Sequence, residues 1–380
     1  MAESLGTGAG GDGRCPLTSL VGVTQTGSGW DSAGFRERVQ SALDSFLDEQ
    51  AARLAALGDD AARLIEEARV SVRGGKRFRA AFCYWGFHAI DPSPADEDAL
   101  VRACAALELL HASALVHDDL MDASDTRRGR PATHRKFESD HGAAGWRGDP
   151  EQYGGAAAIL LGDLLLSWSD ELLRNCGLPL TQVAPALDVF DRCRSEVIAG
   201  QFLDVSVQAR GRADVDTAMT VLRYKSAKYS IERPLHIGAA LAGAGPDEMA
   251  ALTAFGLPLG EAFQLRDDLL GVFGDPETTG KPAGDDLIEG KRTVLVALAL
   301  DAAADEDAAL LDRSLGTSLD EAAVARLRSV IDGSGAHASV EAVITELAGH
   351  AVAALDKADV DEHARAVLRE LASAATDRVV

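Results

Sequence analysis

The sequence predicts an all-α protein, a single large helical bundle, on three observations. Apolar residues recur at spacings of three and four, as in Phe35, Val39 and Leu43, which is the period of an amphipathic helix. Strict alternation of apolar and polar residues, and an Asn-Gly hairpin turn, are close to absent. Segments such as 156–166 and 294–300 are apolar nearly all round, which is typical of helices at the centre of a bundle.

Helices are expected along most of the chain after a flexible N-terminal tail at 1–30, where Gly, Ser and Thr dominate without periodicity. The folded domain is therefore expected to span 31–380. Prolines and glycines at 91–94 and 274–276 mark breaks, and a Gly-rich polar loop is expected over 138–155. The expected helices are 32–57, 59–72, 76–90, 95–117, 155–175, 181–209, 214–243, 246–273, 291–313, 319–331, 337–357 and 361–376.

The composition excludes several classes of protein. Lys and Arg number 37 against 60 Asp and Glu, a net charge of −23, so a general nucleic-acid binder would be repelled by the phosphate backbone. The five cysteines are odd in number and show no CxxC spacing, which disfavours a disulfide scaffold or a structural zinc site. No apolar run approaches the roughly 20 residues of a membrane span, and no signal pattern is visible. We therefore expect a cytoplasmic protein without stable membrane insertion.

The sharpest feature is the cluster of Asp118, Asp119 and Asp122, which follows the apolar segment 103–116. Asp118 and Asp122 are four residues apart, so their carboxylates share a helix face and repel each other. The cluster also falls at the C-terminal end of its helix, where the helix dipole disfavours acidic side chains. A cation must compensate, and carboxylate oxygens suit Mg²⁺, which completes its shell with water and phosphate.

A second acidic pair, Asp267 and Asp268, follows the apolar segment 255–265 and also falls late in its helix. Each pair taken alone is explained equally well as a metal site or as a solvated helix face. Two pairs that each end an apolar helix favour a metal site instead, because solvated faces do not usually follow four turns of core residues.

Basic residues gather at a few places in this acidic chain. Lys76, Arg77 and Arg79 lie on one turn at the start of an expected helix, where backbone N–H groups and the dipole favour an anion. His111 lies two helical turns before Asp118; a lone helical histidine is usually a core residue, but these neighbours favour a phosphate or substrate contact. Further basic residues occur at Arg127, Arg128, Lys225, Lys281 and Lys291. Each alone is an ordinary surface charge, but together they indicate diphosphates held between Mg²⁺ and cations.

This arrangement points to ionisation chemistry. The sequence contains no HExxH, GxSxG or GxxxxGK[ST] motif. Mg²⁺ would draw charge from a departing diphosphate, and an apolar bundle interior would shield a carbocation from water. Ionisation, alkene attack and proton loss need no nucleophilic side chain, and the released diphosphate would serve as the base.

The motifs, in this order, resemble those of the trans-isoprenyl diphosphate synthases, or polyprenyl synthetases, most of all their actinobacterial geranylgeranyl-type members. The resemblance covers about 35–375, with 118–122 similar to the first aspartate-rich motif, 267–268 to the second, and 75–79 to the isopentenyl diphosphate site. It implies an all-α fold of isoprenoid synthase type with a central active-site cavity. It also implies three Mg²⁺ per active site, with Mn²⁺ able to substitute, and a homodimer that acts on small-molecule isoprenoid diphosphates.

The resemblance further implies roles for individual residues. The implied metal ligands are Asp118, Asp119, Asp122, Asp267 and Asp268. The implied catalytic residues are Asp118, Asp119, Asp122, Lys225, Gln264 and Asp267. Isopentenyl diphosphate is expected at Lys76, Arg79, His111 and Arg128. The allylic diphosphate is expected at Arg127, Lys225, Ser226, Gln264 and Lys281. Gln201 and Asp204 match the motif between the two aspartate clusters.

Two positions depart from the family pattern. Gly271 stands where many relatives have a third aspartate, which affects only the outer metal ligand. Ser226 stands where a threonine is usual, and it retains the hydroxyl.

The length of the product is expected to depend on Ser113 and Ala114, because the growing chain runs from Asp118 back along its own helix. Farnesyl-type relatives have an aromatic residue there, so two small residues predict a deeper pocket, with Leu110 as a candidate floor. Head-to-tail condensation of isopentenyl diphosphate with dimethylallyl, geranyl or farnesyl diphosphate would then give geranylgeranyl diphosphate (C20). A farnesyl or longer product (C25 and above) is the alternative, and close helix packing is the alternative reason for the small residues.

Two other classes of function remain as alternatives. A terpene cyclase would need no isopentenyl site, which Lys76, Arg79 and His111 argue against. An inactive regulatory subunit would commonly lack the aspartates, and both clusters are present here.

Overall fold

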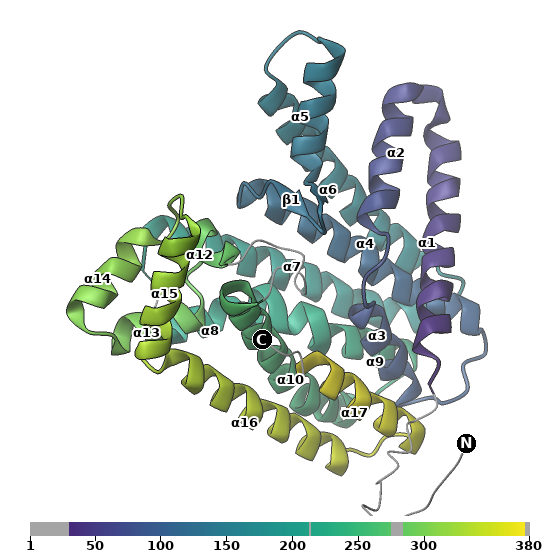
Figure 1. Cartoon of the computed structure of the whole chain (residues 1–380). Helices are drawn as coiled ribbons and strands as arrows, with labels where there is room; N and C mark the ends of the chain where they lie inside the picture. The colour runs from purple at the N-terminus through teal and green to yellow at the C-terminus, as the bar shows by residue number, and fades with distance from the viewer. Residues whose placement is uncertain (1–29, 213, 275–283, 377–380) are drawn as a thin grey trace, which may run out of the picture.

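The computed structural model describes residues 30–212, 214–274 and 284–376 of the chain. Lys281 and all but the last residue of the expected tail therefore lie outside the described residues. The described part is almost wholly helical, which confirms the all-α prediction (Figure 1). Its α-helices are α1 (Ser32–Leu54), α2 (Asp59–Ser71), α3 (Phe78–His88), α4 (Glu97–Met121), α5 (Thr133–Ala144), α6 (Pro150–Arg174), α7 (Leu180–Arg210), α8 (Val215–Val221), α9 (Arg233–Leu241), α10 (Pro246–Phe273), α12 (Asp285–Glu289), α13 (Val294–Ala302), α14 (Asp305–Ser314), α15 (Glu321–Gly333), α16 (Ala336–Lys357) and α17 (Glu362–Thr376).

Side-chain caps explain where several of these helices begin. Asp31, Asp96, Asp214 and Asp320 each accept a hydrogen bond from a backbone N–H in the first turn of α1, α4, α8 and α15. Such a cap stabilises a helix by about 1 kcal/mol, because it satisfies an amide that the helix leaves without a partner.

The expectation of a polar loop over the whole of 138–155 is wrong. The helix α5 occupies its first half and α6 begins at Pro150, where Asp149 accepts a hydrogen bond from the backbone of Glu151. Only residues 145–149 connect the two helices, and Gly145 and Gly148 have positive φ there, but Gly154 serves another purpose. A Cβ at Gly154 would lie 2.2 Å from the carbonyl oxygen of His134, so this glycine lets α5 and α6 pack closely.

The expected helix 214–243 is continuous, but its middle is a π-helix, η2 (Leu222–Glu232), between α8 and α9. A π-helix is rare and marks functional sites, because the extra residue per turn changes the direction of the side chains. The expected helix 291–313 is divided into α13 and α14 at the extended residues Ala303 and Ala304. Three short elements were not expected: α12, the single 3₁₀ turn η1 (Ala55–Leu57), and an antiparallel hairpin of β1 (Thr126–Arg127) and β2 (Arg130–Pro131).

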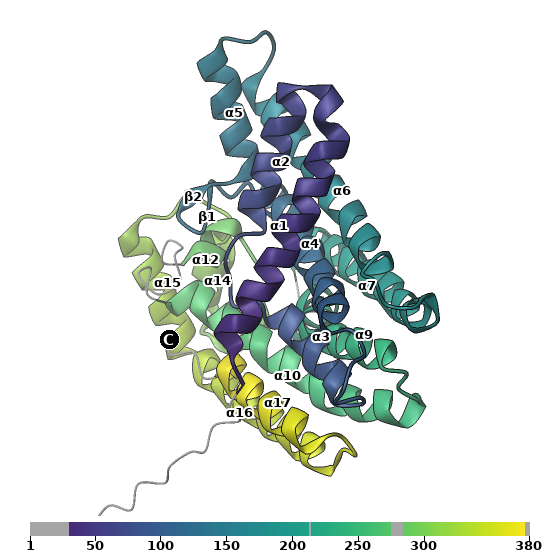
Figure 2. The same cartoon turned by 90° about the vertical axis from the view of Figure 1, so that its right-hand side faces the viewer.

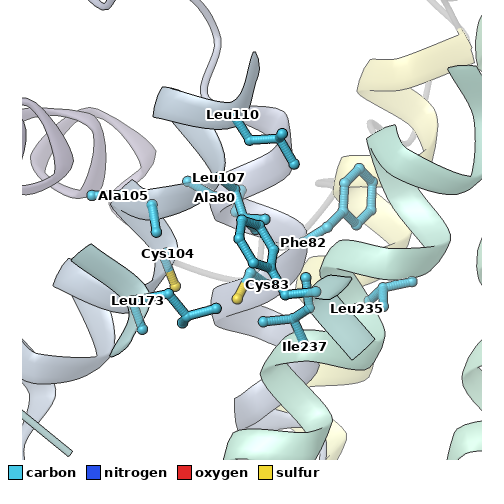
Figure 3. Packing of buried hydrophobic residues seen from close by; sticks show 14 of the residues in the cluster. Ala80, Phe82, Cys83, Cys104, Ala105, Leu107, Leu110, Leu173, Leu235 and Ile237 are labelled. Atoms are coloured by element: carbon cyan, nitrogen blue, oxygen red, sulfur yellow. The ribbon is translucent and has the colours of Figure 1, made fainter. Parts of the chain in front are cut away.

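The core forms around α4, which is buried on nearly all sides, as its apolar sequence predicts. It packs against α3 and α6, and α3 packs in turn against α9. Figure 3 shows Cys104 and Leu107 of α4 beside Phe82 and Cys83 of α3. A Cβ at Gly238 of α9 would lie 1.8 Å from the carbonyl oxygen of Cys83, so this contact requires glycine.

The two ends of the molecule differ. The helices α1, α2 and α5 project together at one end, and α16 and α17 lie side by side at the other (Figures 1 and 2). Two helices, α4 and α16, are long and apolar enough to cross a membrane by length and composition, which corrects the expectation that no run approaches that length. In the most apolar 18-residue stretch of α4, 78% is buried in the protein, as in a core helix. The corresponding fraction in α16 is 22%.

Candidate active site

A cavity of about 1640 Å³ lies among α3, α4, α7, η2, α10 and α12, and we call it the central cavity. Ligand pockets usually enclose about 300–1,000 Å³, so this one can hold more than one small molecule. Its lining combines Asp118, Asp267 and Asp268 with cationic side chains and with small or apolar residues of α4. The structure therefore brings Asp118 of the first acidic cluster, both aspartates of the second and most of the basic residues into one cavity, whereas Asp119 and Asp122 are not part of its lining.

Asp118 lies on the last turn of α4 and faces two other helices. The Nζ atom of Lys225 lies 3.2 Å from its carboxylate, and the side-chain amide of Gln201 donates a hydrogen bond of 2.9 Å. Lys225 also pairs with Asp204 at 2.6 Å. Burial opposes the charge of Asp118, but Lys225 and Lys291 outweigh it and lower the pKa of this carboxyl.

Asp119 does not line the central cavity. It is buried, with 3% of its surface exposed, and Arg127 donates to both carboxylate oxygens through Nε, at 2.9 and 3.2 Å. Asp122 is likewise absent from this lining, so what sets Asp119 apart is its pairing with Arg127. The role of Asp119 as a metal ligand stays a prediction. Its position is that of a side chain that holds Arg127, which does line the cavity.

The second acidic pair lies near the C-terminal end of α10. The amide of Gln264 donates a hydrogen bond of 2.8 Å to Asp268. Burial, followed by the charge of Asp286, raises the pKa of Asp268 to about 8. Burial and the charge of Asp118 likewise raise the pKa of Asp122 to about 6. Burial comes first in both cases, and a neighbouring carboxylate adds to it.

Lys291, which the sequence analysis named only among the basic residues expected to hold diphosphates, pairs with several carboxylates of the site. Its Nζ lies 3.6 Å from Asp122 and 3.3 Å from Asp286, and it also pairs with Glu289. Burial opposes its charge, but Asp286 and Glu289 raise the pKa of Lys291 well above its usual value. The available signal was its place after the acidic pair 285–286 in a Gly-rich stretch.

The structure shows what occupies the space beside Gly271, the position at which the family resemblance implies a third aspartate. A Cβ at Gly271 would lie 2.0 Å from Oδ2 of Asp286 and 2.5 Å from its Cγ. The carboxylate of Asp286 therefore fills the volume that a side chain at position 271 would enter. Both residues line the central cavity, so α12 supplies a carboxylate at the place where α10 lacks one.

The four residues expected to bind isopentenyl diphosphate all line the cavity: Lys76, Arg79, His111 and Arg128. Arg79 donates to the hydroxyls of Tyr229 and Ser230, both at 2.7 Å, and its Nε is buried without a hydrogen-bond partner in the described structure. Arg128 lies with φ of 52° in the β1–β2 turn and donates to the carbonyl of Arg73 at 2.9 Å. The result is a pocket of N–H donors that suits a phosphate group.

Arg77 differs from its neighbours in this basic segment. It precedes α3 in a left-handed conformation, with φ of 57°. Its guanidinium pairs with Glu108 at 2.9 Å and donates to Gln40 and to the carbonyl of Val72, both at 2.6 Å. Arg77 lines the central cavity as its neighbours do, but both of its terminal nitrogens are already hydrogen-bonded within the protein. Its contribution to the anion site stays a prediction.

The three residues proposed to limit product length lie together along α4. Ser113, Ala114 and Leu110 line the cavity, and the hydroxyl of Ser113 donates a hydrogen bond of 2.8 Å to the carbonyl of Gly162 in α6. Sequence reasoning found Gln201 and Asp204 of α7 but missed the apolar lining from α6 and α7. Ile159 and Phe202 line the cavity while 49% and 73% exposed, so this part of its lining reaches the protein surface.

The donor chemistry of the acidic side fits Mg²⁺. Carboxylate oxygens are its preferred protein ligands, and neighbouring carboxylates contribute to the raised pKa values of Asp122 and Asp268 after burial, so a cation would reduce this repulsion. Within the described ranges, no group of three His, Cys, Asp or Glu side chains is close enough to hold a metal ion alone. Gln264, Ser226 and Lys225 line the cavity beside these carboxylates.

Comparison with known proteins agrees with this site. The family model described as polyprenyl synthetase matches residues 62–332. The chain is 33% identical over 293 residues to the short chain isoprenyl diphosphate synthase of Methanothermobacter thermautotrophicus, covering 76% of this chain and 83% of that protein. It is 36% identical over 222 residues to the (2E,6E)-farnesyl diphosphate synthase of Mycobacterium tuberculosis, covering 58% of this chain and 56% of that one.

Among solved structures, the fold is similar to the geranylgeranyl pyrophosphate synthase of Corynebacterium glutamicum, which was crystallised with isoprenyl diphosphate and magnesium. The TM-score is 0.90 at 41% identity, over 92% of this chain and 100% of that one. The fold and the cavity thus define a helical prenyltransferase. The chain belongs to the polyprenyl synthetase family, and trans-prenyl transfer is its activity.

Proposed function

We propose that the protein condenses isopentenyl diphosphate head-to-tail with an allylic diphosphate to give geranylgeranyl diphosphate (C20) and free diphosphate. The observation that supports the chain length is that Ser113 and Ala114, two small residues of α4, line the central cavity where farnesyl-type relatives are expected to have an aromatic residue. Dimethylallyl, geranyl and farnesyl diphosphate are the proposed primers.

The allylic diphosphate would lie between the two acidic clusters, held through divalent cations and by Lys225 and Lys291. We assign Asp118, Asp122, Asp267 and Asp268 as the metal ligands, and we add Asp286 because its carboxylate lies where relatives have one at position 271. Three Mg²⁺ would satisfy these ligands and the diphosphate oxygens, with Mn²⁺ as a substitute. Lys281, outside the described residues, is proposed to bind the same diphosphate, with Arg127, Ser226 and Gln264.

The reaction follows from what surrounds the diphosphate. Bound Mg²⁺ supplies Lewis-acid withdrawal of charge from the departing diphosphate. Lys225 and Lys291 add positive charge at the same place as the allylic C–O bond breaks. The double bond of isopentenyl diphosphate, held by Lys76, Arg79, His111 and Arg128, then attacks the allylic cation and forms the new C–C bond. Loss of a proton to the released diphosphate restores a double bond.

The apolar part of the cavity protects the cation and accepts the growing chain. Ala114 and Leu110 belong to α4, whose apolar side chains exclude water from the reacting carbon. Neither step needs a nucleophilic side chain, and the four described cysteines are buried away from this lining.

We also propose that the protein works in the cytoplasm as a homodimer without stable membrane insertion. Exposed apolar residues on neighbouring helices support a partner surface at α6 and α7. These residues are Ile159, Leu160, Ile198, Phe202 and Val205.

Product analysis tests the proposal. The purified protein is incubated with isopentenyl diphosphate, Mg²⁺ and each allylic primer in turn, and the dephosphorylated products are separated by chain length. A C20 alcohol from all three primers is expected. A dominant C15 or C25 product would support the alternative farnesyl or longer-chain function, and hydrocarbon from an allylic diphosphate alone would support a cyclase.

A further inference from the structure

Tyr229 joins two residues of the basic pocket that the sequence analysis treated as independent. The π-helix η2 brings it into the central cavity beside Arg79 and His111. Nη2 of Arg79 donates to its hydroxyl at 2.7 Å, and Nδ1 of His111 lies 3.1 Å from the same oxygen. The guanidinium carbon of Arg79 also lies 4.3 Å from the centre of the Tyr229 ring.

The direction of each hydrogen bond follows from what each group can donate. A guanidinium has donors only, so the oxygen of Tyr229 accepts from Arg79. Burial raises the pKa of Tyr229, so the phenol keeps its proton. That proton is directed to the other partner of the hydroxyl, Nδ1 of His111. Nδ1 therefore acts as an acceptor.

The surroundings of His111 keep its ring neutral. Burial lowers its pKa well below the usual value, and four guanidinium groups lower it further. Arg79 and Arg77 act from the start of α3, and Arg127 and Arg128 from the β1–β2 hairpin. A neutral ring that accepts at Nδ1 carries its proton at Nε2. No hydrogen bond to Nε2 is made by the described part of the chain.

We propose that Tyr229 is a positioning residue that sets the tautomer of His111, so that the ring presents an Nε2–H donor to the diphosphate of the isopentenyl substrate. This rests on the proposed function for the identity of that substrate. Without the hydroxyl, the proton can move to Nδ1 and leave an Nε2 lone pair facing a phosphate. The same hydroxyl fixes the direction of Arg79, so both donors are oriented before the substrate arrives.

The chain offers a matched pair of variants. Tyr229→Phe removes the hydroxyl and keeps the ring on which Arg79 stacks. Ser230→Ala removes the other hydroxyl that accepts from the same Arg79 nitrogen, at 2.7 Å, without touching His111. If affinity for isopentenyl diphosphate depended on the orientation of Arg79 alone, the two variants would lose similar affinity. If it depends on the tautomer of His111, only Tyr229→Phe loses it.

The test is ¹⁵N NMR of histidine-labelled, full-length protein, with His111→Asn used to assign the signal. We expect the Nε2–H tautomer in the wild type and in Ser230→Ala, and a mixture in Tyr229→Phe. We also expect the KM for isopentenyl diphosphate to rise about tenfold in Tyr229→Phe and at most about threefold in Ser230→Ala, with the allylic KM unchanged.

An unchanged tautomer in Tyr229→Phe, or equal effects of the two variants on KM, would overturn the proposal. The spectra need no substrate, so they separate this proposal from the proposed function. A wild-type protein that makes no prenyl product, yet shows the Nε2–H tautomer, would refute the function and leave the role of Tyr229 in the pocket intact.

Discussion

Adding one methyl group at Gly271 tests whether Asp286 serves the metal site. The new Cβ would lie 2.0 Å from Oδ2 of Asp286, where 3.0 Å is the practical limit, so the carboxylate must move by about 1 Å. Its ion pair with Lys291, now 3.3 Å, would lengthen by a similar amount. We expect Gly271→Ala to weaken the apparent affinity for Mg²⁺ about tenfold, the lower end of the effect of displacing a metal-site partner.

Helix propensity acts in the opposite direction at this position. Gly271 lies inside α10, where replacing glycine by alanine usually stabilises a helix by about 0.5–1 kcal/mol. A loss of Mg²⁺ affinity in Gly271→Ala would therefore not come from a weaker helix. Gly349→Ala in α16 is the matched control, because a Cβ there meets nothing within 4 Å.

The assay is the initial rate of product formation against Mg²⁺ concentration, together with direct Mn²⁺ binding followed by electron paramagnetic resonance. The double variant Gly271→Asp with Asp286→Gly moves the carboxylate from α12 to α10 and should recover most of the affinity that Asp286→Gly loses. An unchanged Mg²⁺ dependence in Gly271→Ala, or a double variant no better than Asp286→Gly, would refute the reasoning.

Three further outcomes are expected. Ala114→Phe should shorten the main product below C20 because the ring fills the cavity beside α4; unchanged chain length on product analysis would refute this limit. Asp119→Asn should raise the KM for the allylic diphosphate several-fold, since it releases Arg127, and should leave the Mg²⁺ dependence unchanged; a shifted Mg²⁺ dependence would make Asp119 a ligand. Because the pKa of Asp268 is raised from 3.8 to about 8, the metal-free native state binds more protons than the unfolded state. The native state of the metal-free protein should therefore become less stable as the pH rises from about 4 to 8, and Asp268→Asn should lack this loss. Thermal melts with a chelator measure it. Melting temperatures that change with pH in parallel in the two proteins would contradict the prediction.

Much of the fold and the acidic site could be predicted because the signals are local. The helical period and the apolar runs before Asp118 and Asp267 are properties of neighbouring residues, and the described structure agrees with them. The prediction of a loop over 138–155 failed because glycine occurs both in turns and where two helices pack closely. Gly154 serves close helix contact, and the sequence alone does not separate that use from a turn.

The parts of the site that were missed depend on contacts between distant segments. Lys291 and Asp286 become central only when α12 folds beside the ends of α4 and α10. Arg77 and Asp119 carry the right charges, but each is taken up by a partner that only the folded chain supplies, Glu108 and Arg127. A motif identifies a charge, whereas the packing decides which partner neutralises it.

Anomalous diffraction from crystals grown with Mn²⁺ and an unreactive allylic diphosphate analogue tests the central claim most directly. The account predicts manganese peaks within ligand distance of Asp118 and Asp122 on one side of the diphosphate and of Asp267 on the other. A diphosphate bound at the basic pocket alone, with no manganese between the acidic clusters, would contradict it.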